Sequence, residues 1–182
     1  MRTLHERADV IPLIAEVFRE FGFEGTSLSR ITEKTALGKG SLYHFFPGGK
    51  EEMAGAVLAH VDAWFEREVF APLREDPPDV AIARMWRAVD DYFRSGRRVC
   101  LVGAFALDET RDRFAAVIAG YFTRWIAALR DALVRRGWEA RAANDSAEEA
   151  VLGIQGALVL ARAMRDDAVF GRALARLRAR LA

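Results

Sequence analysis

Residues 26–46 read TSLSRITEKTALGKGSLYHFF, and this stretch predicts two short helices joined by a tight turn. Ser27 is placed as an N-cap, because its side-chain oxygen can accept a hydrogen bond from a free N–H of the helix that begins at Leu28. Residues 36–38 interrupt the helical pattern, and a second short helix is expected over residues 39–46. This order of helix, turn and helix predicts a helix-turn-helix motif, whose second helix contacts DNA.

The second helix of this pair carries distinct apolar and polar side chains. Its apolar side chains are available for packing against the rest of the protein, and they are Leu42, Phe45 and Phe46. Its polar side chains are available for contact with a partner, and they are Lys39, Ser41, Tyr43 and His44. This division is typical of a helix that packs on one side and contacts DNA on the other.

The distribution of charge supports a DNA-binding role more than the total does. The net charge is only +1, which is low for a protein that binds polyanionic DNA. However, every lysine of the chain lies in or beside the motif, at Lys34, Lys39 and Lys50, and no acidic residue stands between Lys34 and Lys50. A local positive surface is what phosphate contact requires. A chance acid-free stretch on a solvated face is the alternative.

Composition predicts a folded, soluble protein. Of the 182 residues, 52% are hydrophobic and 29% are charged, which is enough for a core and a solvated surface. No run approaches the roughly 20 apolar residues that cross a bilayer, and the first residues, MRTLHERADV, carry charges where a signal peptide is apolar. We therefore expect a cytoplasmic location and no membrane partner. Cys100 is the only cysteine, so an internal disulfide and a thiolate metal cluster within one chain are excluded.

The rest of the chain predicts further helices and no strand of useful length. A first helix is expected from near Asp9 to the glycines at 22 and 25. After a short break at residues 47–49, a long helix is expected over residues 50–71, followed by a proline-rich, acidic loop over residues 72–79. Later helices are expected near residues 82–93, around Phe105, and over about 111–136, 146–165 and 168–181. The predicted fold class is therefore all-α, with about nine helices.

The helix expected over residues 146–165 is apolar on two sides. One apolar side is sufficient for an internal core. A second side indicates another partner, and its glycines permit close backbone approach, so we interpret this helix as a homodimer interface. The candidate interface residues are Leu152, Gly153, Gly156, Val159 and Leu160. A central helix buried within one chain is the alternative.

Residues 26–50 closely resemble the DNA-binding signature of the TetR family of bacterial transcriptional regulators. The residues that carry the resemblance are Thr26, Ile31, Leu37, Lys39, Gly40, Ser41, Leu42, Tyr43, His44, Phe45, Phe46 and Lys50. The remaining chain resembles the family in its layout of helices alone. The resemblance implies a three-helix helix-turn-helix DNA-binding domain in residues 1–49 and an α-helical effector-binding and dimerisation domain in residues 50–182.

Three features depart from the common family pattern. Ala36 stands where the family usually has glycine in the turn, and Gly38 stands where a serine or threonine usually caps the second helix of the motif. The segment Pro47-Gly48-Gly49-Lys50 is one residue longer than the common spacer and is similar to that of the LmrA and YxaF type regulators. The longer spacer changes where Lys50 is expected to point.

The resemblance implies a ligand-responsive repressor that binds an inverted-repeat operator in double-stranded DNA as a dimer. The second helix of the motif would enter the major groove. The residues expected to contact DNA are Thr26, Ser27, Lys39, Gly40, Ser41, Tyr43, His44 and Lys50. A small apolar or aromatic effector would release the operator. The candidate pocket residues, each with plain core packing as its alternative role, are Trp64, Trp86, Phe93, Phe105, Phe122 and Trp125.

Other functions have less support in the sequence. No glutamate is followed three residues later by histidine, so the paired ligands of a helical di-iron enzyme are absent. We find no metal-ligand spacing, phosphate loop or nucleophile motif, and we expect no enzymatic activity, metal or cofactor. Redox sensing through Cys100 is an alternative, since Arg97 and Arg98 would favour its thiolate, although its apolar neighbours favour a buried side chain. An architectural DNA-binding protein would not need the larger aromatic-rich domain.

Overall fold

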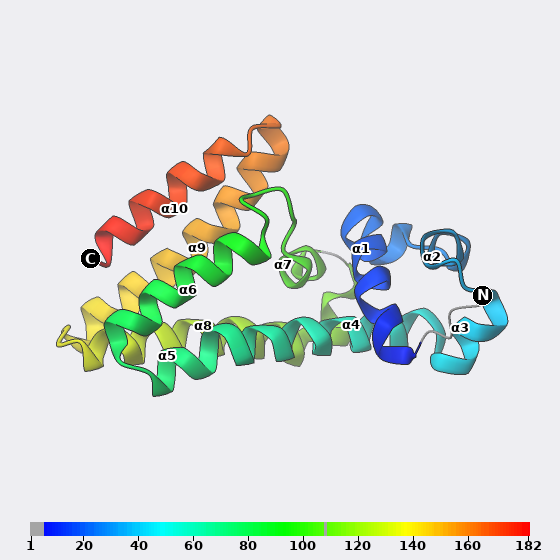
Figure 1. The fold of residues 1–182 in the computed structure, drawn as a ribbon, viewed down its shortest axis with the longest axis horizontal. Helices are drawn as coiled ribbons and strands as arrows, with labels where there is room; N and C mark the ends of the chain where they lie inside the picture. The colour runs from blue at the N-terminus through cyan, green and yellow to red at the C-terminus, as the bar shows by residue number, and fades with distance from the viewer. Residues whose placement is uncertain (1–5, 108) are drawn as a thin grey trace. The chain divides into compact units, whose positions relative to one another are not determined.

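The computed structural model describes residues 6–107 and 109–182, and all regular elements in these ranges are helices (Figure 1), which confirms the all-α prediction. In chain order they are α1 (Arg7–Gly25), α2 (Leu28–Thr35), α3 (Lys39–Phe45), α4 (Gly49–Phe65), the π-helical η1 (Glu66–Phe70), α5 (Ala71–Glu75), α6 (Pro78–Tyr92), α7 (Leu101–Ala106), the 3-10 helical η2 (Glu109–Phe114), α8 (Ala115–Arg135), α9 (Ala140–Met164) and α10 (Ala168–Arg180). No helix in the described ranges has the length and apolarity that a bilayer crossing requires.

The chain divides into two compact units, which we describe separately. The first contains the described residues up to Ala63 together with those of Leu101–Ile118, and the second contains Trp64–Cys100 with Ala119–Ala182. This division differs from the predicted boundary after Gly49, since the first unit also includes most of α4, all of α7 and η2.

Aromatic packing explains why α7 belongs to the first unit. The ring of Phe105 in α7 packs edge-on against Phe18 and Phe23 of α1, with centroid separations of 5.6 and 6.1 Å. The ring of Phe114 lies 6.2 Å from that of Phe23. Phe18, Phe23 and Phe105 are almost fully buried, so α1 is held by α7 as well as by the motif.

Helix α1 begins two residues before the start predicted near Asp9. Its N-cap is Glu6, and the Glu6 N–H donates to Asp9 Oδ2 at 3.1 Å, so this capping interaction sets the start at Arg7. Pro12 consequently lies inside the helix, beyond the first turn. Proline provides no N–H for the carbonyl of Ala8, and the exposed position of Ala8 lets water solvate that oxygen.

Glycine and threonine together end α1. Gly22 has a φ of +68°, which breaks the helical pattern as its sequence position predicted. The hydroxyl of Thr26 donates to the carbonyl of Gly22 at 2.6 Å, and the Thr26 N–H donates to the carbonyl of Phe23 at 3.2 Å. These bonds satisfy carbonyls that the interrupted helix leaves free.

A π-helical segment joins α4 to α5. The Ala71 N–H donates to the carbonyl of Glu66, five residues earlier, instead of to the carbonyl four residues earlier. In a regular α-helix, the ring of Pro72 would clash with the carbonyl four residues before it. The wider π turn relieves this clash, so Pro72 lies in α5 and the predicted loop over residues 72–79 is only the short link between α5 and α6. If α4, η1 and α5 are counted as one continuous helix, and η2 with the adjoining α8 as another, the described part of the chain has the predicted nine helices.

Helix α9 begins at Ala140, before the predicted start near Ser146. Its N-cap is Glu139, whose Oε2 accepts a hydrogen bond from the Ala142 N–H at 3.0 Å. Hydrogen bonds from the backbone N–H groups of Arg141 and Ala142 favour the ionised carboxylate and lower the pKa of Glu139. Side-chain caps of this kind are usually Ser, Thr, Asp or Asn, so the sequence pattern did not indicate this start.

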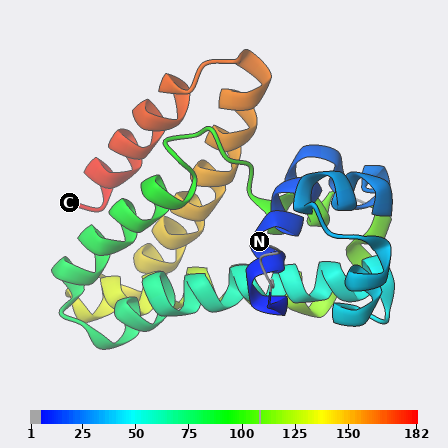
Figure 2. The same ribbon diagram turned by 45° about the vertical axis from the view of Figure 1, so that its right-hand side comes forward.

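Helices α9 and α10 lie side by side and run in opposite directions (Figures 1 and 2). A Cβ added at Gly153 of α9 would lie only 2.8 Å from Leu177 Cδ1 of α10. Gly153 therefore permits the close approach of these two helices. The sequence placed Gly153 in the candidate dimer interface, whereas the structure uses it for packing within the chain.

Candidate nucleic-acid interface

Helices α2 and α3 form the predicted helix-turn-helix motif. The Ser27 Oγ accepts a hydrogen bond from the Arg30 N–H at 3.3 Å, which confirms its role as the N-cap of α2. On the inner side of α2, Ile31 is fully buried and the hydroxyl of Thr35 donates to the carbonyl of Ile31 at 2.7 Å. The same Thr35 oxygen accepts from the Leu37 N–H at 3.3 Å. The start and the end of α2 are thus both set by short polar side chains.

The turn between the two helices passes through a left-handed residue. Ala36 has φ +56° and ψ +17°. Alanine in this region costs on the order of 1 kcal/mol, because its Cβ approaches the backbone, whereas glycine does not have this penalty. Gly38 then serves as the N-cap of α3, with extended backbone and no side-chain cap. Ala36 and Gly38, two of the three departures from the common pattern, therefore lie at the turn and at the cap, as predicted.

Helix α3 separates its side chains into a buried set and an exposed set. Leu42 and Phe46 are fully buried, and Phe45 is half-buried. The exposed residues are Lys39, Gly40, Ser41, Tyr43 and His44. A Cβ added at Gly40 would meet nothing within 4 Å, so packing within the chain does not require glycine there.

Lys39 is a cation of this exposed surface that has no ion-pair partner in the described structure. Among the described residues, no acidic side chain pairs with Lys39, whereas the Nζ of Lys34 lies 4.0 Å from Glu20 Oε2. An exposed and unpaired ammonium is available for a phosphate.

Two of the residues predicted to contact DNA are instead engaged inside the unit. Thr26 is 2% exposed, and its hydroxyl and its backbone N–H both donate to carbonyls at the end of α1. The Nζ of Lys50 donates to the carbonyl of Phe23 at 3.0 Å and lies 4.3 Å from the centroid of the Phe23 ring. Lys50 therefore contacts α1, and the contacts of Thr26 and Lys50 argue against direct phosphate binding by these two residues. Ser27 remains exposed at the start of α2.

Arg7 is a contact of the motif that the sequence pattern did not indicate. It lies in the first turn of α1, and its Nε donates to the carbonyl of Phe45 at 3.0 Å, at the C-terminal end of α3. The two residues are 38 positions apart in sequence, so no local pattern links them.

Three of the candidate pocket residues surround Phe65 in the second unit. The ring centroids of Trp64, Phe93 and Trp125 lie 5.0, 6.1 and 5.2 Å from that of Phe65. Phe93 and Trp125 are fully buried, and the indole Nε1 of Trp125 has no hydrogen-bond partner among the described residues. A buried indole N–H usually has a hydrogen-bond partner, so this unpaired donor is unusual.

The other three candidates lie elsewhere. Phe105 is part of the core of the first unit, and Phe122 is half-buried with its ring 5.0 Å from that of Tyr121. Trp86 lines two pockets beside α10, with volumes of about 260 and 190 Å³. Phe105 thus belongs to the first unit, whereas the other five candidates belong to the second.

The exposed side of α9 is apolar over several turns. Leu152 is 71% exposed, Val159 61% and Leu160 52%. Gly156 is also exposed, and a Cβ added there would meet nothing within 4 Å. Apolar side chains grouped in this way usually indicate an interface with another molecule.

Neither a metal site nor an accessible thiol is found in the described part of the chain. No group of three or more His, Cys, Asp or Glu residues in these ranges could hold a metal ion. The side chain of Cys100 is buried at 6% exposure, as its apolar neighbours predicted. Burial limits the access of oxidants to the thiol, which argues against the redox-sensing alternative.

The strain at the turn can be measured. Ala36→Gly is expected to raise the free energy of unfolding by up to about 1 kcal/mol, because glycine adopts a positive φ without the Cβ penalty. Ala59→Gly is the matched control, since Ala59 is exposed in the interior of α4, where glycine costs about 1 kcal/mol. Urea denaturation of the two variants should give effects of opposite sign, and destabilisation by Ala36→Gly would contradict the strain.

Models of known protein families match both the N-terminal and the C-terminal part of the chain. The family model described as bacterial regulatory proteins of the tetR family matches residues 13–57, and the model described as the C-terminal domain of LmrA/YxaF-like transcriptional regulators matches residues 78–176, more than half of the chain. The second match confirms the LmrA and YxaF type branch that the longer spacer indicated.

Individual relatives and solved structures agree with these matches. The HTH-type transcriptional regulator YxaF of Bacillus subtilis is 25% identical over 165 residues, covering 88% of this chain and 86% of its own. The regulator Rv0196 of Mycobacterium tuberculosis is 28% identical over 172 residues, with the same coverage. A TetR transcriptional regulator from Legionella pneumophila has the same fold, with a TM-score of 0.80 at 18% identity over 97% of both chains. The chain therefore belongs to the TetR family of bacterial transcriptional regulators, in the branch with an LmrA/YxaF-like C-terminal domain, and is a transcriptional regulator with an N-terminal DNA-binding domain.

Proposed function

We propose that this regulator is a ligand-responsive repressor that binds an inverted-repeat operator as a homodimer and is released by a small apolar or aromatic effector. The DNA-binding part of this proposal is supported by the separation of buried and exposed side chains on α3. Leu42 and Phe46 anchor the helix in the core, while the polar side chains predicted to contact DNA stay exposed.

Each exposed residue of α3 suits a contact in the major groove. Lys39 provides a cation for a phosphate, and Gly40 lets the helix approach the DNA closely. Tyr43 and His44 can donate hydrogen bonds to phosphates, which position the protein without specifying sequence. Ser41 adds a small hydroxyl. Few residues of α3 then remain to contact base edges, so one copy of α3 specifies only a few base pairs. Two copies, bound to an inverted repeat, are therefore needed to specify a full operator.

Lys39→Ala is expected to weaken binding to DNA of any sequence and to lower the slope of log K against log salt by about one unit, because one phosphate contact is lost. The measurement is fluorescence anisotropy with a duplex enriched by the wild-type protein from a randomised library, at about 50 to 200 mM salt. Arg172→Ala is the control, since Arg172 is an exposed cation of α10 in the other unit. An unchanged salt slope for Lys39→Ala would contradict the phosphate contact.

The homodimer is supported by the exposed apolar side of α9. One side of α9 already packs in the core through Ile154, Leu158 and Ala161, which are buried. The exposed side, with Leu152 and Val159, is left largely uncovered by the described residues and would be covered by the same side of a second copy. Gly156 would allow the two backbones to approach closely.

Leu152→Glu is expected to raise the dimer dissociation constant by at least about 100-fold, because a charge would be buried in an apolar interface. Val80→Glu is the matched control, since Val80 is an apolar side chain of α6 that is 56% exposed outside the proposed interface. Sedimentation equilibrium should show dimers for the wild type and Val80→Glu, and monomers for Leu152→Glu at micromolar concentration. A monomeric wild type would exclude the proposed dimer.

The effector site is proposed for the aromatic cluster around Phe65. The cluster offers apolar rings, and the buried Nε1 of Trp125 is a donor that would fix the orientation of a ligand. Helix α4 begins just after the motif at Gly49 and ends at Phe65, so one helix leads from the spacer to the cluster. We infer that effector binding shifts the dimer to a geometry in which the two α3 helices no longer match the operator.

A panel of small apolar and aromatic compounds is expected to include at least one that releases the enriched duplex. Trp125→Phe should weaken this release about three- to tenfold, the effect of losing one buried hydrogen bond, while leaving duplex affinity without the compound unchanged. Trp138→Phe is the control, because Trp138 follows α8 outside the cluster. If no compound and no cell extract changes the affinity of the protein for the enriched duplex, the effector proposal is contradicted.

A further inference from the structure

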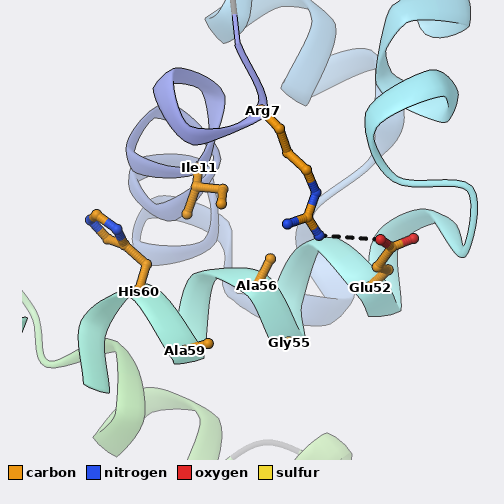
Figure 3. A pocket seen from close by; sticks show the side chains of 7 residues that line it. All are labelled: Arg7, Ile11, Glu52, Gly55, Ala56, Ala59 and His60. Carbon is orange, nitrogen blue, oxygen red and sulfur yellow. Dashed lines mark hydrogen bonds and ion pairs between the residues drawn. The ribbon is translucent and has the colours of Figure 1, made fainter. Parts of the chain in front are cut away.

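A guanidinium–carboxylate pair joins the first turns of α1 and α4. Arg7 Nη2 lies 3.2 Å from Glu52 Oε1, and Figure 3 shows the two side chains facing each other at one end of a groove between these helices. The same guanidinium donates from Nε to the carbonyl of Phe45 at 3.0 Å and lies 4.8 Å from the centroid of the Phe46 ring. Arg7 therefore contacts α4 and the C-terminal end of α3 at once.

The second oxygen of Glu52 binds the spacer that follows α3. Glu52 Oε2 accepts a hydrogen bond from the Gly48 N–H at 2.8 Å. A Cβ added at Gly48 would lie 3.2 Å from Glu52 Cβ and Oε2, so glycine permits this close approach. Glu52 thus links Arg7 with the spacer.

The end of α3 needs such support for two reasons. The helix has only seven residues, so its last carbonyls find few partners within the helix and it is not stable alone. The spacer contains two consecutive glycines, Gly48 and Gly49, which restrain the backbone little. The carbonyl of Phe45 and the N–H of Gly48 flank the two residues Phe46 and Pro47, and the Arg7–Glu52 pair binds both groups.

We propose that Arg7 and Glu52 are positioning residues that hold α3 at the orientation needed for sequence-specific DNA binding. This inference rests on the proposed contact between α3 and DNA. The pair is partly exposed, with 48% of the Arg7 side chain and 33% of the Glu52 side chain accessible, so it contributes little to global stability. The pair instead determines how well ordered the backbone of α3 and of the spacer is.

Glu52→Gln separates this role from simple electrostatics. Loss of a negative charge near the motif would by itself strengthen DNA binding. Loosening of α3 has the opposite effect, and we expect Glu52→Gln to weaken binding to the duplex enriched from a randomised library by about three- to tenfold, as for one or two lost hydrogen bonds. Binding to an unrelated duplex of equal length at low salt should be unchanged or slightly stronger.

Glu51→Gln is the matched control. It removes the same charge from the same turn of α4, but Glu51 Oε2 lies 3.7 Å from Arg113 and does not contact Arg7 in the described structure. Glu51→Gln should bind both duplexes as well as the wild type or slightly better. Equal effects of the two substitutions on the enriched duplex would overturn the proposal.

Hydrogen–deuterium exchange of the full-length protein without DNA tests the same inference independently of DNA binding. Amides of residues 39–49 should exchange about threefold faster or more in Glu52→Gln than in Glu51→Gln, while amides of α9 are unchanged. Equal exchange over residues 39–49 would overturn the positioning role. If the wild type enriches no duplex, the DNA proposal fails, whereas the exchange result still decides whether the pair orders α3.

Discussion

The proposed DNA-binding surface depends on the burial of two side chains, one in the very short helix α3 and one at its C-cap. Leu42 and Phe46 are fully buried, and a helix of seven residues is not stable in water by itself. Their packing therefore decides both that α3 forms and which of its sides faces solvent. The exposed positions of Lys39, Tyr43 and His44 follow from this anchoring, because these residues lie on the remaining sides of the helix.

Helix α1 is the common support for these contacts. Arg7 at its start binds the end of α3, and the carbonyl of Phe23 near its end accepts a hydrogen bond from Lys50. The ring of Phe105 in α7 packs against Phe18 of the same helix. The motif is thus oriented by a helix that is itself held by Lys50 and α7, which follow the motif in the sequence. A short motif with a strained turn requires such support.

The elements with a local signal were predicted well. The cap at Ser27, the left-handed break at Gly22 and the stop of α8 before Gly137 each depend on one residue and its near neighbours. Two of the boundaries that differed from the prediction have uncommon causes. A π turn relieves the clash that Pro72 would otherwise cause, and Glu139 acts as an N-cap, a position that glutamate rarely occupies.

The sequence by itself determined the all-helical fold, the helix-turn-helix motif and the two apolar sides of α9, because capping and apolar spacing act over a few residues. Only the tertiary structure decided the roles of individual long-range contacts. It directs Lys50 to the carbonyl of Phe23, places Phe105 in the core of the DNA-binding unit and joins Arg7 to Glu52. Each of these partners is tens of residues away in the chain, and which one a side chain meets depends on how the helices pack.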